Sequence, residues 1–299
     1  MNSILTIRDL LRKVYAGYGA VIKPLFKIVL AFFMLSLIEK QMGYSNMLAR
    51  PVVICAASVI CAFFPYGFIS FVCAIFVIGN MFEVSVMMAG FTALVGMLIF
   101  VLYYGYKPGT GIIISIVPLM FYFKLPFIVP VILGLSVGFY SAVPAALGVV
   151  CWNVISYFLE NADSMTSAGG LEIADEIISV ARTIFTNEYM YLVIFAFILC
   201  IAAVSIISKS SLNHCWLISV SVGIVILAAV MVLGGSYLGS DSFTSDIIGL
   251  LISFILAFAY VSVIYAVDFS RTEHLSYEDD DYYYYVKAVP KIRTDKNER

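Results

Sequence analysis

The feature that constrains the fold most is a long stretch of chain with almost no charge. From Pro51 to Glu160 the only Asp, Glu, Lys or Arg side chains are Glu83, Lys107, Lys124 and Glu160 itself. Charged residues make up 12% of the whole chain, against about 25% in an average soluble domain. A water-soluble fold cannot cover its surface with so few charges, so the sequence predicts an all-α, polytopic membrane protein.

The sequence also argues against several classes of function. A net charge of −2 gives no reason to expect a nucleic-acid partner. The chain has neither a Walker A sequence nor an H-E-x-x-H motif, and its histidines, His214 and His274, lie far apart. The segment Gly134–Gly138 matches G-x-S-x-G, but that hydrolase motif needs a strand–turn–helix and partner residues. Ser136 is therefore interpreted as part of a small-residue packing face, and we expect no enzyme, cofactor or metal site.

Ten apolar segments are candidates for membrane spans. A helix needs about 20 apolar residues to cross a bilayer. Five segments approach or meet this length, at 24–38 with its flanks, 84–104, 189–207, 215–233 and 247–267. Five shorter pieces cover 51–64, 67–81, 109–123, 126–143 and 144–158. We expect about ten spans, and the count falls to eight if the first two short pieces form a re-entrant hairpin.

The placement of lysine and arginine predicts that both chain ends lie in the cytoplasm. The first 27 residues carry five basic side chains, and the segment 268–299 carries six. The loop 161–188 has five acidic side chains and only Arg182 as a base, so it should lie outside. Lys40 and Arg50 depart from this scheme, which places them on the outer side.

These features divide the chain into five parts. They are a basic amphipathic helix on the inner membrane face (1–23), a bundle with short broken helices (24–160), an external loop (161–188), three membrane helices (189–267) and an acidic, tyrosine-rich tail (268–299). The alternative for 1–23 is the solvated start of the first span. The external loop should form an interfacial helix, with one apolar face made of Ile173, Ala174, Ile177, Ile178, Ala181, Ile184 and Phe185.

The region 109–159 should form short helices, because proline and glycine interrupt it repeatedly. The pattern V-P-x-x-L-G begins at Val129 and again at Val143. Proline suits the first turn of a helix, so each copy should begin or kink a helical piece. The expected break residues are Gly109, Gly111, Pro118, Pro126, Pro130 and Pro144. Lys124 then lies between two helices, where the helix dipole favours a cation and the long stem reaches a headgroup or a water-filled cavity.

Four polar side chains in this apolar sequence are candidates to face a substrate cavity, since broken helices mark the substrate sites of transporters. They are Lys124, Asn153, Glu83 and Asn80. Each also has a structural interpretation. Lys124 would anchor a turn at the interface, Asn80 and Glu83 would mark the boundary of a span, and Asn153 would hydrogen-bond a neighbouring helix.

The tail contains a cluster of four tyrosines, Tyr282, Tyr283, Tyr284 and Tyr285, with strong strand propensity. We expect either that this cluster pairs with the sheet edge of a cytoplasmic partner or a second copy, or that it is disordered in the headgroup region. Residues 271–292 resemble the tails of uncharacterised polytopic membrane proteins from anaerobic Gram-positive bacteria. The resemblance implies a multi-pass protein of a bacterial cytoplasmic membrane and brings no known function with it.

Two functions from different classes fit the sequence. The first is a transporter or permease with a substrate cavity near the broken helices of 109–159. The alternative is a non-catalytic membrane scaffold, or a subunit of an envelope assembly, whose tail docks a cytoplasmic protein. The scarcity of ionisable residues within the spans weighs against an ion-coupled transporter, because such proteins usually bury several.

Overall fold

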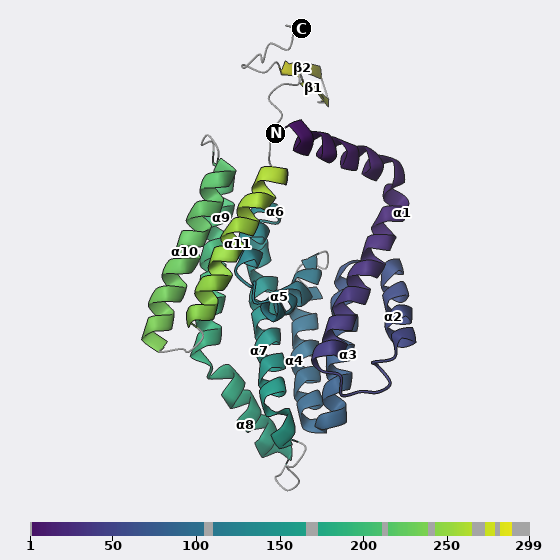
Figure 1. Ribbon diagram of the computed structural model, residues 1–299, viewed down its shortest axis with the longest axis vertical. Coiled ribbons are helices and arrows are strands. Elements are labelled where there is room, and N and C mark those ends of the chain that lie inside the picture. Colours follow the sequence, from purple (N-terminus) through teal and green to yellow (C-terminus); the bar gives the residue numbers. More distant parts are fainter. Residues whose placement is uncertain are drawn as a thin grey trace.

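The chain folds into a set of helices followed by one small β-hairpin (Figure 1). The structure is a computed structural model that describes residues 2–104, 110–165, 173–210, 215–238, 243–264, 273–278 and 282–288. The helices are α1 (Asn2–Gln41), α2 (Pro51–Phe63), α3 (Gly67–Val84), α4 (Val86–Tyr104), α5 (Ile112–Tyr122), α6 (Ile128–Ser136), α7 (Ala142–Met165), α8 (Ile173–Phe185), α9 (Glu188–Ser208), α10 (Cys215–Leu238) and α11 (Phe243–Ile264), with a 3₁₀ turn at Phe139–Ser141. The expected helical architecture is confirmed, and the hairpin is an addition to it.

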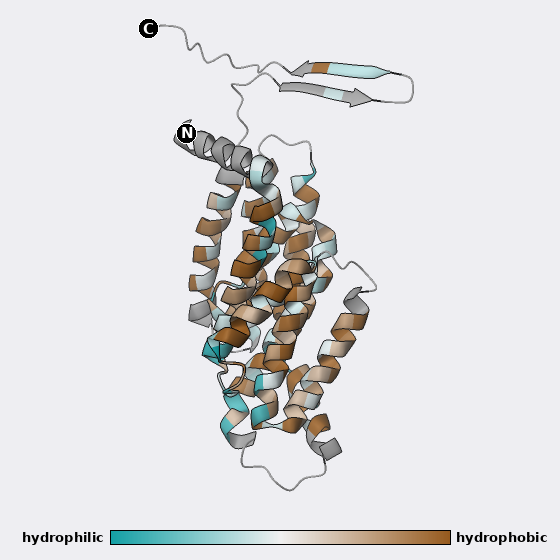
Figure 2. Cartoon of the chain, turned by 90° about the vertical axis from the view of Figure 1, so that its right-hand side faces the viewer, coloured by the Kyte–Doolittle hydropathy of each residue, from teal (hydrophilic) through white to brown (hydrophobic). Residues whose placement is uncertain are grey.

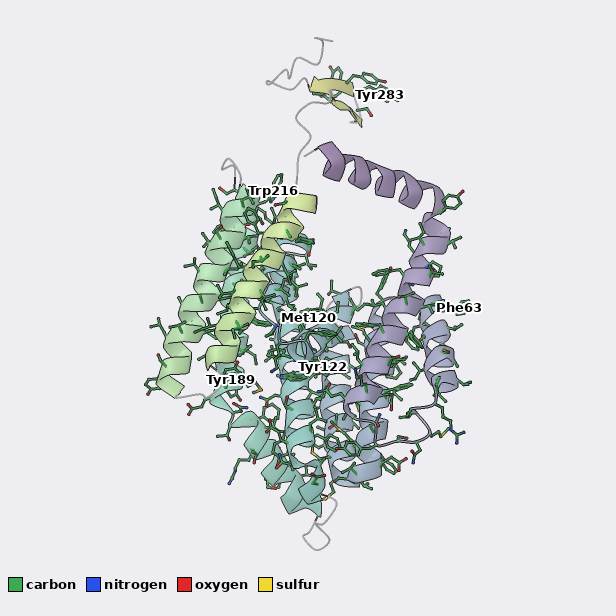
Figure 3. All side chains as sticks on the ribbon, in the orientation of Figure 1. Phe63, Met120, Tyr122, Tyr189, Trp216 and Tyr283 are labelled. Carbon is green, nitrogen blue, oxygen red and sulfur yellow. The ribbon has the colours of Figure 1, made fainter. Side chains whose placement is uncertain are left out.

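The outer surface of the helical body is apolar. Large hydrophobic side chains point outward, among them Phe63, Ile206 and Leu233, which are 83%, 72% and 71% exposed. Figure 2 shows hydrophobic residues along the helices, and Figure 3 shows Phe63 pointing away from the body. Among the described residues, five helices are long and apolar enough to cross a membrane: Gly17–Gln41, Gly67–Val84, Phe139–Asp163, Glu188–Ser208 and Cys215–Tyr237. Lipid is the natural partner of such a surface, so the protein is embedded in a membrane.

Helix α1 contains a kink, and it covers both the segment expected to form a surface helix (1–23) and the expected first span that follows it. Tyr18 has φ −117° and ψ 18°, outside the helical range, and Figure 1 shows a sharp bend in the first half of α1. Gly17 and Gly19 flank this residue, and small residues of this kind are common where helices kink. The bend therefore lies within the segment 1–23, and Pro24 lies inside the helix after the bend.

Three helices in the first half of the chain are shorter than a bilayer is thick. At 1.5 Å per residue, the 13 residues of α2 reach about 20 Å, the 11 of α5 about 17 Å and the 9 of α6 about 14 Å. The hydrocarbon core measures about 30 Å. None of these three helices crosses that core by itself.

Helix α9 lies at the centre of the packing. Its side chains Phe197, Cys200, Ile201 and Val204 are fully buried, and it contacts α6, α7 and α10. Helix α7 connects this core to a second one, where its Phe158 packs with side chains of α3, α4 and α8. Of the helices that carry the expected breaks, α5 packs on α7 and α6 packs on α9, and these two long helices also contact each other.

Helix α8 is amphipathic, with a narrower buried face than the sequence predicts. Val180 and Ile184 are buried against α4 and α7. Ile178 and Phe185, expected on the same face, are 59% and 43% exposed. Ile178 directly follows Ile177 and Phe185 directly follows Ile184, both of which pack in the buried cluster, and one position turns a side chain by about 100° around the helix.

The tyrosine cluster pairs with the chain's own preceding segment. Strands β1 (Glu273–Glu278) and β2 (Tyr283–Ala288) are antiparallel, with Tyr277 opposite Tyr284. The sequence predicts a partner's sheet or disorder for these tyrosines, whereas in the structure they pair with β1 of the same chain. The outer edge of each strand is free of any partner among the described residues, and a two-stranded hairpin alone is at best marginally stable in water.

Candidate functional site

Lys124 lies in the turn that joins α5 to α6. The N–H of Lys124 donates to the carbonyl of Phe121 and the N–H of Leu125 donates to that of Met120, both at 2.9 Å, which is the Schellman pattern of a helix C-terminus. Lys124 has φ +58°, the left-handed conformation that glycine usually supplies there. Pro126 follows and prevents the helix from continuing. The Lys124 side chain is exposed.

The turn sits where three parts of the chain meet. A Cβ at Gly249 of α11 would lie 3.0 Å from the Lys124 carbonyl. The ring of Phe123 stacks on Phe33 of α1, with centroids 6.2 Å apart. Lys124 lines neither of the two cavities described below, so the structure does not bring it together with the other candidates.

The two copies of V-P-x-x-L-G have the same local structure. Pro130 and Pro144 each occupy the third position of a helix, α6 and α7 respectively, where the missing N–H costs no hydrogen bond. The glycine of each copy lies at a close helix contact. A Cβ at Gly134 would lie 2.8 Å from Val204 of α9, and one at Gly148 would lie 2.6 Å from a side chain of α5.

Pro118 was expected to break a helix, and this prediction is wrong, because Pro118 lies inside α5. Proline has no N–H, so the carbonyl of Ile114, four residues earlier, loses its helical partner. A Cβ at Gly148 would lie 3.2 Å from this carbonyl. Because Gly148 has no side chain, α7 can approach this carbonyl closely. Gly111 precedes α5 as its N-cap, while Gly109 lies outside the described residues.

Asn80 is wholly buried in α3 and uses both ends of its amide. Its Oδ1 accepts from the N–H groups of Tyr44 and Ser45, each at 3.0 Å, and its Nδ2 donates to Oε1 of Glu39 at 2.7 Å. Asn80 therefore holds the connection between α1 and α2. Glu83 is exposed, and its Oε1 accepts from the Ser45 hydroxyl at 3.5 Å.

Asn153 lines a cavity of about 850 Å³ between α7, α8 and α9. Its Oδ1 accepts from Nδ2 of Asn187 at 3.3 Å. Asn187 is also the N-cap of α9, because its own Oδ1 accepts from the N–H groups of Tyr189 and Met190. Asn153 thus hydrogen-bonds the residue that caps a neighbouring helix, and it also lines a cavity.

The lining of this cavity is both polar and aromatic. The rings of Phe121 and Trp152 stack with centroids 5.5 Å apart and an angle of 14° between their planes. Arg182 of α8 and Glu160 of α7, both exposed, add opposite charges to the lining. A lining of this kind suits a small molecule with a polar and an apolar part. Trp152 also lines a second cavity, which is largely apolar, measures about 140 Å³ and is bordered by α1, α3, α4, α5 and α7.

Three further residues belong to these sites although their sequence context does not mark them as site residues. In the sequence Arg182 stands out only as the one basic residue, beside five acidic ones, of the loop 161–188. Asn187 carries the signal of a helix N-cap, an asparagine just before an apolar run. Glu39 is followed by Lys40 and resembles an interfacial charge pair at the end of a span.

The described residues contain no group of three or more His, Cys, Asp or Glu side chains that could hold a metal ion. Compared with protein families, with curated proteins and with solved structures, the chain finds no match in any of the three. The interpretation of the site therefore depends on its own geometry.

Proposed function

We propose that this chain is a multi-pass permease of a bacterial cytoplasmic membrane, with both of its ends in the cytoplasm. The start of α1 and the β-hairpin lie at one end of the molecule and α8 lies at the other (Figure 1). The basic ends and the acidic loop between 161 and 188 agree with this orientation. In this arrangement α5 with α6 enters the membrane as a hairpin, because both helices are too short to cross it. Helix α2 is also too short, so α3, although long enough to cross, returns with α2 to the same side.

The observation that carries the proposal is the cavity of about 850 Å³ between α7, α8 and α9. It is large enough for a small organic molecule. It lies beside the segments with the broken helices, and Phe121 of α5 contributes to its lining. Its substrate would place an apolar part against Phe121 and Trp152 and a polar part near Asn153 and Arg182.

A ligand screen on the purified protein tests this function. Thermal unfolding in detergent is measured with amino acids, organic acids, sugars and nucleosides in turn, because a ligand that binds only the folded state raises the melting temperature. We expect one chemical class to stabilise the protein and to be taken up by proteoliposomes.

Two variants and one control locate the binding. Asn153→Leu and Arg182→Gln should abolish the stabilisation by the ligand. Ser262→Ala should preserve it, because Ser262 is an exposed residue of α11 that does not line the cavity. Stabilisation that survives both cavity substitutions would show that the ligand binds elsewhere and would refute the proposed site.

A scaffold function is the second candidate, and the hairpin is the observation that favours it. Tyr283 and Tyr285 are 71% and 83% exposed, and Figure 3 shows Tyr283 on the hairpin, well apart from the helices. A free strand edge accepts an added strand from a partner. Deleting residues 278–299 should leave membrane insertion intact and remove one specific cytoplasmic protein from the purified complex. An unchanged set of co-purifying proteins would exclude docking by the tail.

A further inference from the structure

A buried polar cluster lies at the end of α1 and is separate from the cavity proposed to bind substrate. Glu39, Ser45 and Asn80 are 8%, 3% and 0% exposed. They come from α1, the connection to α2, and α3. Carboxyl groups are rarely buried within membrane helices, and such a residue is usually functional.

The Glu39 carboxyl is only half satisfied. Its Oε1 accepts from Nδ2 of Asn80 at 2.7 Å. Its Oε2 is buried and has no hydrogen-bond partner among the described residues. A buried carboxylate with an unpaired oxygen costs several kcal/mol, and one bound proton removes that charge.

The charged and titratable groups around Glu39 leave this oxygen unpaired. Lys40, next in sequence, is exposed. Glu83 of α3 reaches the cluster only through the Ser45 hydroxyl. The α1–α2 connection adds Tyr44 and Arg50, both exposed, and α7 adds two exposed acids, Glu160 and Asp163.

We infer that Glu39 is an exchangeable proton-binding site at the α1–α3 contact, formed with Asn80. The neighbouring groups favour a proton over a metal ion. The N–H groups of Tyr44 and Ser45 already occupy Oδ1 of Asn80, and Nδ2 of Asn80 occupies Oε1 of Glu39, which leaves Oε2 of Glu39 as the oxygen that can take a ligand. A hard cation needs about six oxygen ligands, whereas a proton needs only Oε2.

Proton binding by Glu39 does not depend on the proposed function, but the role of that proton in transport does. In a permease, a proton that binds between α1 and α3 is a candidate for the coupling ion. Asn80 would connect proton binding to the conformation of the α1–α2 connection, because it hydrogen-bonds Glu39 and also the backbone after α1. A change in the charge of Glu39 would therefore act on the α1–α2 connection.

Infrared difference spectroscopy of the full chain in proteoliposomes tests the site without any substrate. Spectra are compared between acidic and alkaline pH for the wild type, Glu39→Gln and Glu83→Gln. We expect the wild type and Glu83→Gln to show the carbonyl band of a protonated carboxyl in apolar surroundings, and Glu39→Gln to lose it. Identical spectra for the wild type and Glu39→Gln would overturn the inference.

A second measurement needs only the wild type, in case Glu39→Gln does not fold. Dicyclohexylcarbodiimide, an apolar reagent for protonated carboxyls, should modify Glu39, and the modification should fall as the pH rises. Protection of Glu39 by increasing Na⁺ at constant pH would show a cation site and overturn the inference, as would the absence of labelling at Glu39. Failure of either test leaves the cavity of α7, α8 and α9 untouched, and failure of the ligand screen leaves these tests valid.

Discussion

At the scale of single residues, the membrane part of the fold depends on a few positions where side-chain size or backbone conformation is restricted. Gly134 and Gly148 let helices approach more closely than any side chain would allow. Lys124 takes a left-handed conformation at a helix end. These positions define where α5, α6 and α7 lie, and α5 and α7 both contribute residues to the lining of the cavity.

Gly148→Ala should destabilise the protein by about 1–3 kcal/mol, because the new Cβ would lie 2.6 Å from Val117 and overpack the contact. Gly90→Ala is the matched control, since a Cβ there meets nothing within 4 Å. The control should be neutral or stabilising by up to about 1 kcal/mol, from helix propensity. Thermal unfolding in detergent measures both, and equal effects of the two substitutions would contradict the close contact.

Lys124→Gly should stabilise the fold, whereas Lys124→Ala should not. A non-glycine residue in the left-handed region costs about 1–2 kcal/mol, which glycine avoids. The greater conformational freedom of glycine in the unfolded chain offsets about 0.4–1 kcal/mol of this gain. The alanine variant removes the charge and keeps the strained backbone, so it separates the two effects in the same unfolding measurement. A stabilisation by Lys124→Ala as large as that by Lys124→Gly would trace the effect to the charge.

At the scale of elements, α8 forms one wall of the proposed substrate cavity and packs on the body with a narrow apolar face. Ile184 is 1% exposed and lies in the cluster around Phe158 of α7. Arg182 and Thr183, on the same helix, border the cavity. The packing of α8 therefore determines the shape of the site.

Ile184→Ala should cost about 2–5 kcal/mol, as for other large-to-small changes in a core. Ile178→Ala removes the same atoms from a position that is 59% exposed and should change stability by less than about 0.5 kcal/mol. Protease cleavage of α8 and thermal unfolding report on the pair. Similar losses in both variants would mean that α8 does not pack through Ile184.

The sequence predicts the elements better than the site. The apolar runs and their prolines predict the helices, because span length and proline chemistry are local properties. Pro118 was misjudged because a distant residue, Gly148, accommodates the carbonyl that this proline leaves unpaired. Asn187 and Asn153 are 34 residues apart in the chain, and their hydrogen bond follows only from the packing of α7 on α9. Glu39 and Asn80 meet for the same reason, through contacts between α1 and α3.

At the scale of the whole molecule, the two ends carry different features, a polar cavity at one end and a tyrosine-rich hairpin at the other. The end with α8 holds the polar cavity, and the other end holds the start of α1 and the tyrosine hairpin (Figure 1). Under the proposed topology the cavity opens to the outside and the hairpin faces the cytoplasm. Asn153, halfway along α7, would then be reached by water from outside although it lies within a membrane helix.

Thiol labelling of intact cells tests this arrangement most directly. The six native cysteines are replaced by alanine, and single cysteines are introduced by Asn153→Cys or Ser276→Cys. A membrane-impermeant maleimide should label the cysteine at position 153 in intact cells and the one at 276 only after the membrane is permeabilised. Labelling at 276 in intact cells, or no labelling at 153 before or after permeabilisation, would contradict the outward-facing cavity.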